Sequence, residues 1–233
     1  MVKNPALPVR GDDDWWTGDV AVALIGLAAL LAWESAGLDL VLTRAYGSAV
    51  GFAWRDAWIT RTLLHDGGRA LAWGVLALLA LDAQQMQLPG PPRRERWFWV
   101  GVMLMCLLLV PTIKRLTSSS CPWDLAEFGG AAVYVPHWLL GVRVGGPGHC
   151  FPSGHAVTAF AFFAPYFAWR AYRPRLARRW LIGVLLVGVA FAWAQLARGA
   201  HFASHSAWSA WLCWALCTAA ARWRARTPAI VSA

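Results

Sequence analysis

The chain has 233 residues, of which 58% are hydrophobic and only 14% charged, and its mean hydropathy is +0.45. Soluble domains carry about a quarter of charged residues, so this composition excludes an ordinary soluble enzyme and indicates a membrane protein. The net charge of +9 would suit a nucleic-acid-binding protein, but the basic residues lie between apolar stretches and form no stripe with aromatic residues. No nucleic-acid partner is therefore expected.

Six apolar stretches recur along the chain, each bounded by charge, glycine or proline. They are Val20–Trp33, Ala70–Leu81, Trp97–Ile113, Ala156–Trp169, Trp180–Ala197 and Ser206–Ala221. A spanning helix needs roughly 20 apolar residues, so several of these helices must extend into their flanks or hide a charge inside the bundle. Ala70–Leu81 gives the weakest signal. The pattern predicts an all-α fold, a six-helix transmembrane bundle with an outward-facing loop region, formed as one domain over residues 1–233.

Acidic residues precede the first apolar stretch, at Asp12, Asp13, Asp14 and Asp19, where a secretory signal peptide would carry basic ones. No clean small-residue cleavage site follows, so this helix is expected to be retained. The 17 tryptophans crowd the ends of the apolar stretches, which is typical of belts at the interface between lipid and water.

The basic residues indicate which side of the membrane each connection faces. Thirteen of the 21 Lys and Arg residues lie at the two termini and in the second and fourth connections. They are Lys3, Arg10, Arg93, Arg94, Arg96, Arg170, Arg173, Arg175, Arg178, Arg179, Arg222, Arg224 and Arg226. Because cytoplasmic segments carry the excess of basic residues, both termini are predicted to be cytoplasmic in a bacterial inner membrane, and the region from Lys114 to Ser153 to face the periplasm.

The first long connection, Glu34–Arg69, interleaves apolar and charged side chains. Its apolar residues Phe52, Trp54, Trp58, Leu63 and Leu64 lie among Arg55, Asp56, Arg61 and His65. This predicts an amphipathic helix in the membrane interface, acting as a lid or a packing element. We interpret His65, His137 and His149 as loop or interface residues, and Glu34 and Asp82 as helix-end charges.

The strongest chemical motif is Pro152-Ser153-Gly154-His155, which follows a loop rich in Gly and Pro and opens an apolar helix. Backbone N–H groups at a helix start, with a serine hydroxyl and a glycine that permits close approach, form a cradle for a phosphate. His155 would lie one residue from that cradle. The same four residues also suit an ordinary helix cap, and both interpretations stay open at this point.

Two further polar clusters are predicted at the same membrane level. Lys114 to Pro122 follows the third apolar stretch, and Arg198 to His205 connects the fifth stretch to the sixth. Ionisable residues at helix ends in a membrane protein are costly unless they pair or function. Three such clusters together therefore favour a functional site.

These residues resemble the type 2 phosphatidic acid phosphatase superfamily of six-helix membrane enzymes, over roughly residues 114–209. That family's pattern is a lysine followed after six residues by Arg-Pro, then Pro-Ser-Gly-His, then Ser-Arg, five residues, His, three residues and Asp. Here the second part is intact. In the first part Lys114 is followed after six residues by Cys121-Pro122, and the best match to the third part is Gly199 to His205.

Both arginines of the family pattern are replaced in this chain. Cys121 stands at the first arginine position, so one phosphate ligand is missing unless Arg115 or Arg143 substitutes for it. Gln195 stands at the second. Arg198, one helical turn further along the same face, is expected to supply the guanidinium instead.

The resemblance implies covalent catalysis without a metal or another cofactor. His201 attacks phosphorus to form a phosphohistidine, while His155 protonates the leaving oxygen and later activates water. The nonbridging oxygens are expected to be held by Lys114, Ser153, the Gly154 backbone and Arg198.

The residue that orients the nucleophile also departs from the family pattern. His205 occupies the position of the family's aspartate, which would hold the second ring nitrogen of His201. A neutral His205 accepts that hydrogen bond and a protonated one does not. The substitution therefore predicts activity that is lost as the pH falls and His205 becomes protonated.

Two of the five cysteines, Cys121 and Cys150, lie in the outward loop next to proposed site elements. Because the periplasm is oxidising, we expect a disulfide between them that ties the first cluster to the phosphate cradle, worth about 3–4 kcal/mol in the chain-entropy model. Cys106, Cys213 and Cys217 fall within apolar stretches and are interpreted as buried thiols.

Two other functions stay open. A metal-dependent membrane hydrolase is favoured by the i, i+4 spacing of His201 and His205, to which His149, Cys150 and His155 could add ligands. A non-catalytic protein that binds or transports a lipid phosphate would retain the cradle without turnover. For the enzyme, the expected partners are a lipid-phosphate substrate and membrane lipids; the sequence selects neither the lipid, nor hydrolysis over phosphotransfer, nor an oligomeric state.

Overall fold

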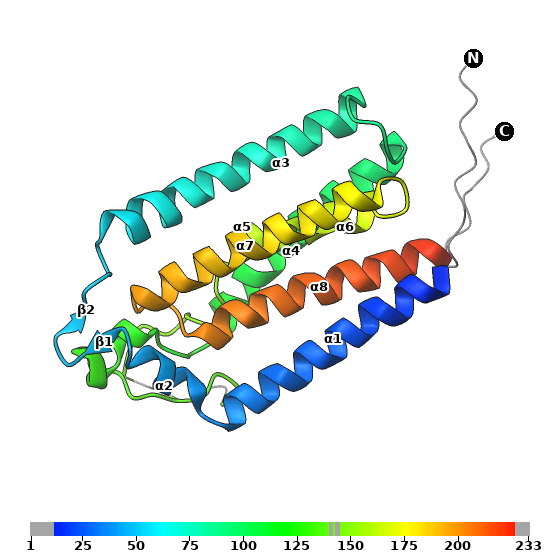
Figure 1. Ribbon diagram of the computed structural model, residues 1–233. Helices are drawn as coiled ribbons and strands as arrows, with labels where there is room; N and C mark the ends of the chain where they lie inside the picture. Colours follow the sequence, from blue (N-terminus) through cyan, green and yellow to red (C-terminus); the bar gives the residue numbers. More distant parts are fainter. Residues whose placement is uncertain (1–11, 140–141, 143–144, 227–233) are drawn as a thin grey trace, which may run out of the picture.

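The computed structural model describes residues 12–139, 142 and 145–226 and is mostly helical (Figure 1). Its long helices are α1 (Asp12–Ser35), α3 (Gly68–Gln85), α4 (Arg93–Leu116), α7 (Pro174–Ala197) and α8 (Ala203–Arg226). A further helical segment consists of α5 (Val157–Phe160), η4 (Ala161–Phe163) and α6 (Ala164–Trp169). Each of the six apolar stretches lies in one of these segments, so the predicted helices are confirmed, including the one with the weakest signal.

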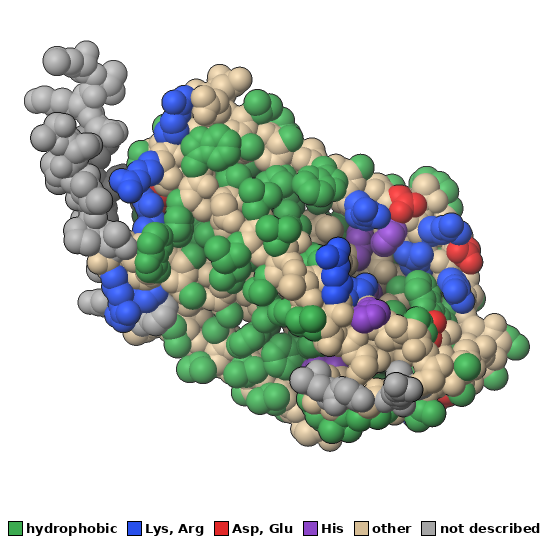
Figure 2. All heavy atoms as spheres, turned by 180° about the vertical axis from the view of Figure 1, so that it is seen from behind, with side chains coloured by type: hydrophobic (Ala, Val, Ile, Leu, Met, Phe, Trp, Pro, Cys, Tyr) green, Lys and Arg blue, Asp and Glu red, His purple; other side chains and the backbone are tan. Residues whose placement is uncertain are grey.

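Among the described residues, three helical segments are long and apolar enough to cross a membrane: Thr17–Ser35 within α1, and the whole of α4 and α7. The segment Val157–Trp169 is apolar but shorter. Figure 2 shows hydrophobic side chains over the middle of the molecule, with Lys and Arg gathered toward its two ends. This pattern indicates membrane association, whereas six membrane crossings remain a prediction.

Successive long helices run in opposite directions, with α1 beside α8 and α3 beside α4 (Figure 1). The first residue of α1 and the last of α8 lie at one end of the bundle, which we call the terminal end. Helix α2 (Leu38–Thr43) and the connections that follow α1, α4 and α7 lie at the other end, which we call the site end. All three polar clusters of the sequence belong to the site end.

The connection between α1 and α3 is not a single amphipathic helix, because it also contains two short strands. Strands β1 (Gly47–Ser48) and β2 (Gly51–Phe52) pair in antiparallel register, so the fold is not entirely helical. The chain then forms the π-helix η1 (Ile59–Gly67), which leads directly into α3. The single-helix prediction is wrong for its first half, because Gly51 adopts a φ of 101° and permits a tight turn that hydrophobic patterning does not reveal.

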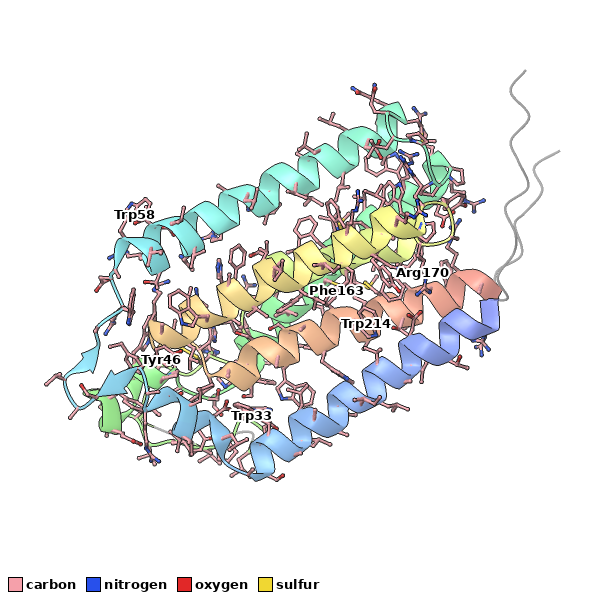
Figure 3. The ribbon with its side chains drawn as sticks, in the orientation of Figure 1. Trp33, Tyr46, Trp58, Phe163, Arg170 and Trp214 are labelled. Atoms are coloured by element: carbon pink, nitrogen blue, oxygen red, sulfur yellow. A yellow bond between two sulfur atoms is a disulfide. The ribbon has the colours of Figure 1, made fainter. Side chains whose placement is uncertain are left out.

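The core of the bundle lies between α4, the α5–α6 segment, α7 and α8. Aromatic rings fill it: Phe163 contacts Trp214 with ring centroids 5.4 Å apart (Figure 3). Phe167 contacts both Trp214 and Trp99. Met103 is 1% exposed among them. This close-packed region fixes the ends of the helices that carry the candidate site residues.

Buried charges at the terminal end are paired with one another. Asp82 at the end of α3 contacts Arg96 of α4, and both side chains are almost fully buried. Further pairs join Asp19 to Arg170 at 2.7 Å and Glu95 to Arg224 at 3.1 Å. Asp82 is therefore half of a buried ion pair, which corrects its interpretation as a simple helix-end charge.

Candidate active site

Segments that are far apart in the sequence meet at the site end through backbone hydrogen bonds. The N–H of Cys150 donates to the carbonyl of Ser119 at 3.0 Å, which joins the segment after α4 to the segment before α5. The N–H of Ser153 donates to the carbonyl of His205 at 3.0 Å, which joins the latter segment to the start of α8. The three polar clusters are therefore brought together.

Lys114 lies in the last turn of α4 and reaches the Pro152–His155 motif. Its Nζ lies 3.8 Å from the point where a Cβ on Gly154 would stand, so the glycine leaves room beside the ammonium group. Ser153 is fully buried, and its Oγ accepts a hydrogen bond from the N–H of Ala156 at 3.3 Å. Ser153 thus stabilises the turn that leads into α5, while Gly154 and Lys114 supply the space and the positive charge that an anion requires.

His155 lies just before α5 and is 5% exposed. Its Nε2 lies 3.1 Å from the carbonyl of Leu64, which fits an Nε2–H donor, and its Nδ1 has no partner among the residues that the structure describes. The ring packs against Phe191 and His65, with centroids 4.6 and 4.7 Å apart. Burial, reinforced by the charges of His65 and Arg198, lowers the pKa of His155 to about 3, so the ring is neutral.

His201 lies in the turn between α7 and α8 and is 4% exposed. Its Nδ1 lies 3.5 Å from Sγ of Cys150. Burial and the charge of Lys114 lower the pKa of His201 well below its usual 6.5, and the charge of His155 acts in the same direction. His201 is therefore neutral, as a nucleophile must be.

His205 does not form the expected hydrogen bond with His201. Its Nδ1 lies 3.1 Å from the carbonyl of Cys150, and its ring centroid lies 5.8 Å from that of His201. The carbonyl can only accept, so Nδ1 of His205 carries a hydrogen and donates it. The orienting contact at Nδ1 of His201 comes from Cys150 instead, which corrects the prediction.

Arg198 follows α7 and is 8% exposed. Its Nε donates to the carbonyl of Arg55 at 2.9 Å. After burial, the charges of Arg198 and Arg69 also lower the pKa of both His155 and His65. Figure 2 shows histidine side chains surrounded by Lys and Arg at this end of the molecule.

Gly199 forms the turn that follows Arg198. Its φ is 72°, and a Cβ at this position would lie 2.4 Å from the ring of Phe52, which packs over it from β2. Only glycine fits both the backbone conformation and the close approach. The turn therefore holds Arg198 and His201 on either side of a fixed bend.

The structure does not place Arg115 or Arg143, the two residues considered as substitutes for the missing arginine, among the candidate site residues. Arg115 is exposed at the end of α4, whereas the neighbouring Lys114 is partly buried. Arg143 lies outside the described residues. A binding role for Arg115 stays a prediction.

The family model described as PAP2 superfamily matches residues 96–228, which is more than half of the chain and includes Lys114, His155, Arg198 and His201. The chain belongs to the PAP2 superfamily. Membership confirms the resemblance to type 2 phosphatidic acid phosphatases and implies phosphatase activity on phosphate esters. Searches among curated proteins and among solved structures give no match.

This PAP2 member carries a disulfide within its candidate site. Cys121 and Cys150 are bonded with an S–S distance of 2.07 Å and Cα atoms 5.1 Å apart, which confirms the expected pairing. The bond fastens the segment after α4 to the segment before α5. Cys106, Cys213 and Cys217 are buried free thiols, also as predicted.

His65 is a candidate site residue that its sequence context does not reveal. The π-helix η1 brings it against His155, and its Nδ1 lies 2.8 Å from Oδ1 of Asp66. Adjacent His and Asp residues in a long connection are the one local signal that could have pointed to it. π-Helical turns are often found at functional sites, which agrees with this position.

Asp39 of α2 supports the start of α8 from a distance. Its carboxylate accepts hydrogen bonds from the N–H of Ser204 at 3.0 Å and from the Ser204 hydroxyl. A carboxylate at a helix N-terminus satisfies free N–H groups and opposes the helix dipole. No local pattern could reveal this contact, because 165 residues separate the two partners.

One group of potential metal ligands occurs in the part of the chain that the structure describes. It consists of Cys121, Cys150 and His201, whose ligand atoms all lie within 4.8 Å of one another. It differs from the set suggested by the sequence, since it excludes His205 and His155. Both sulfurs are joined in the disulfide, so in this oxidised form only the imidazole is available as a ligand.

Proposed function

We propose that this PAP2 member is a membrane phosphatase that hydrolyses, or transfers, the phosphate of a lipid-linked phosphomonoester or diphosphate through a phosphohistidine on His201. The observation that carries the proposal is the convergence of Lys114, His155, Arg198 and His201 at one end of the helix bundle. Two neutral imidazoles near two cations meet the needs of phosphoryl transfer: a nucleophile, a proton carrier and positive charge around the nonbridging oxygens.

The proposed reaction has two steps. In the first, Nε2 of His201 attacks phosphorus, the bond from phosphorus to the ester oxygen breaks, and His155 gives a proton to that oxygen. In the second step, the oxygen of a water molecule attacks phosphorus while the water gives a proton to His155. The P–N bond to His201 breaks, and phosphate leaves. Lys114, Arg198 and the Gly154 backbone hold the nonbridging oxygens, and the proposed reaction uses no metal.

His155 must carry a proton in the first step, although its pKa is about 3 in the structure. A phosphate dianion held between Lys114 and Arg198 would lie next to the imidazole, and an opposite charge at that distance favours the protonated form. Substrate binding is therefore expected to raise the pKa of His155. The proton needed by the leaving group is taken up together with the substrate.

Cys150 takes the place of the orienting carboxylate in this proposal. Nδ1 of His201 faces its sulfur at 3.5 Å, and the Cys150 backbone raises the pKa of His201 against the stronger effect of burial. With Nδ1–H directed at the sulfur, Nε2 keeps the lone pair that attacks phosphorus. Sulfur is a weak acceptor, so it fixes the tautomer more than it stabilises the cationic intermediate.

An apolar groove supports a lipid-linked substrate. A cavity of about 380 Å³ between α3, α5 and α7 extends from Gly68 and Phe191 along side chains such as Leu71 and Val75. Phe191 packs against His155 at one end of this groove. A hydrocarbon chain in the groove would present its phosphate to His155.

The proposed setting is a bacterial inner membrane crossed six times, with both termini in the cytoplasm and the site on the periplasmic face. The excess of Lys and Arg in the terminal segments and in the second and fourth connections supports this orientation. The common position of the start of α1 and the end of α8, opposite the site end, is consistent with an even number of crossings (Figure 1).

The proposal is tested with purified protein in detergent and lipid phosphates labelled with ³²P: phosphatidate, phosphatidylglycerol phosphate, undecaprenyl diphosphate and lipid A phosphates. Released phosphate and protein-bound label are both measured. We expect turnover of at least one lipid and a bound label that is stable in base and lost in acid, present in the wild type and absent from His201→Gln. Binding of a lipid phosphate without release would indicate a non-catalytic protein instead.

Chelation separates the proposal from a metal-dependent hydrolase. Activity that survives exhaustive chelation is the expected result, because positive side chains supply the charge stabilisation. Loss of activity that zinc restores would establish the metal-dependent reaction and contradict the proposed mechanism.

A further inference from the structure

The disulfide lies against the imidazole that carries the proposed chemistry. Sγ of Cys150 is 3.5 Å from Nδ1 of His201, and the ligand atoms of Cys121, Cys150 and His201 lie within 4.8 Å of one another. Cys150 and His201 are 0% and 4% exposed, whereas Cys121 is partly exposed. Two sulfurs and one ring nitrogen therefore share a buried corner whose more accessible side is Cys121.

We propose that reduction of the Cys121–Cys150 disulfide turns this corner into a site for a soft divalent cation such as Zn²⁺, and that the occupied site holds the phosphatase inactive. The two thiolates and Nδ1 of His201 are the ligands. Metal binding follows from the positions of these three side chains alone, whereas the loss of activity rests on the proposed role of His201.

The spacing of the ligands suits tetrahedral zinc. Zn–S bonds of about 2.3 Å and Zn–N bonds of about 2.0 Å place a sulfur and a nitrogen ligand roughly 3.5 Å apart. Sγ of Cys150 and Nδ1 of His201 already have this separation, at 3.5 Å. After the S–S bond breaks, the sulfur of Cys121 needs to move only until it lies about 3.8 Å from that of Cys150, by the same geometry.

The chemistry of both steps balances. A dithiol reductant gives two electrons and two protons to the disulfide and becomes a cyclic disulfide itself, leaving two thiols. Zn²⁺ then displaces both thiol protons, so the two thiolates neutralise its charge.

Coordination at Nδ1 would remove the nucleophile. An imidazole that binds a metal through Nδ1 keeps its one proton on Nε2, so the nitrogen facing the phosphate has no lone pair. In the oxidised form the proton is on Nδ1, directed at the sulfur, and Nε2 is free. The oxidised enzyme is therefore the active form, and the reduced, zinc-loaded enzyme is inactive.

Zinc content is measured on the full chain in detergent, in a background where Cys106, Cys213 and Cys217 are replaced by Ala so that no other thiol binds metal. The oxidised protein, and the protein reduced with dithiothreitol that is then removed, are equilibrated with Zn²⁺ and desalted. We expect one zinc per chain after reduction and none before it. Adding C121S and C150S should abolish binding, and His201→Gln should weaken it at least tenfold. Equal zinc in the reduced background protein and its C121S/C150S variant would overturn the site.

A second measurement needs no substitution. In the reduced wild type, Zn²⁺ should slow alkylation of Cys121 and Cys150 by iodoacetamide at least tenfold, as mapped by mass spectrometry. Unchanged alkylation rates would contradict zinc binding even if the variants above failed to fold.

Activity toward a lipid phosphate is then compared in the four combinations of oxidation and zinc. Zinc should inhibit the reduced enzyme at least tenfold, a chelator should reverse this, and the oxidised enzyme should be unaffected. Zinc binding without inhibition would overturn the inactivation. An oxidised protein with no phosphatase activity would instead refute the proposed function, and the zinc site would still be decided by the binding and alkylation data.

Discussion

The two ends of the helix bundle differ in how their buried cations are paired. At the terminal end carboxylates face arginines, as in the buried Asp82–Arg96 pair. At the site end Lys114 and Arg198 form no ion pair within the described part of the chain, and Nδ1 of His155 has no hydrogen-bond partner there. The paired arginines of the terminal end are thus neutralised within the fold, whereas these two cations of the site end are not.

This contrast separates residues that stabilise the fold from residues that are free to bind a substrate. A buried cation without a counter-charge is costly, so Lys114 and Arg198 favour a functional explanation. Arg198 donates its Nε–H to the carbonyl of Arg55 and forms no ion pair with a carboxylate among the described residues. An incoming phosphate would supply the missing acceptors and the missing negative charge together.

The largest effect is expected at the site end, from His201→Gln. Removal of the nucleophile should lower kcat by about 10⁴-fold or more, which corresponds to about 5 kcal/mol of transition-state stabilisation. The thermal midpoint in detergent should change little, because the contact at Nδ1 of His201 is only a sulfur atom. A variant that keeps a tenth of the wild-type kcat would exclude His201 as the nucleophile.

The opposite outcome is expected at the terminal end. Asp82→Asn leaves Arg96 buried without its counter-charge and should lower the free energy of unfolding by about 3–5 kcal/mol. The folded fraction should keep its kcat, because the pair lies at the far end of the bundle from His201. Denaturant unfolding in detergent and kcat per folded molecule are the measurements.

A double variant is the control for this ion pair. Asp82→Leu combined with Arg96→Met removes both charges and should regain most of the lost stability. Equal destabilisation of the single and double variants would show that packing, and not charge pairing, is what Asp82 provides.

A neighbouring pair of residues sharpens the comparison within the site end. Lys114 is partly buried beside Gly154, whereas Arg115 is exposed. Lys114→Gln should lower kcat/KM by about 10²–10³-fold, as expected for loss of a group that stabilises developing charge. Arg115→Gln removes the same charge one residue away and should have a much smaller effect. Equal losses in the two variants would mean that Arg115 also binds the phosphate.

His155 should make stability depend on pH. Its folded-state pKa of about 3 lies below the usual 6.5, so the unfolded chain takes up the proton first as the pH falls. The stability contributed by the neutral ring is fully present above pH 6.5 and is lost as the pH falls toward 3. Between pH 7 and pH 5 the free energy of unfolding should fall by on the order of 2 kcal/mol through this residue. His155→Gln should remove that share of the pH dependence; an unchanged slope would contradict the burial of a neutral ring.

The helices could be predicted because each leaves a long apolar stretch in the sequence. The strands β1 and β2 and the π-helix η1 could not, since their short segments carry no periodicity that separates them from an amphipathic α-helix. The ion pair of Asp82 and Arg96 was missed for another reason. Each residue lies at the end of an apolar stretch, where a solvated charge is the ordinary interpretation.

The candidate site divides in a similar way. Lys114, His155 and His201 could be found because their motifs are local. The groups that contact the two imidazoles could not, because the carbonyl of Leu64 is 91 residues from His155 and the sulfur of Cys150 is 51 residues from His201. The motif residues can be recognised from their neighbours in the sequence. The tautomer of each ring depends on contacts with residues far away in the sequence.

The smallest effect is expected from His205→Asn, which tests whether Cys150 has replaced the family's aspartate as the orienting residue. In the structure His205 donates to the carbonyl of Cys150 at 3.1 Å. An asparagine N–H can donate from nearly the same position, so kcat should stay within about threefold. His205→Asp offers only acceptors there and should lower stability by about 1–3 kcal/mol, because it leaves the buried carbonyl unpaired beside a carboxylate. If the aspartate variant instead matched or exceeded the wild-type kcat while the asparagine variant lost activity, position 205 would orient His201 after all.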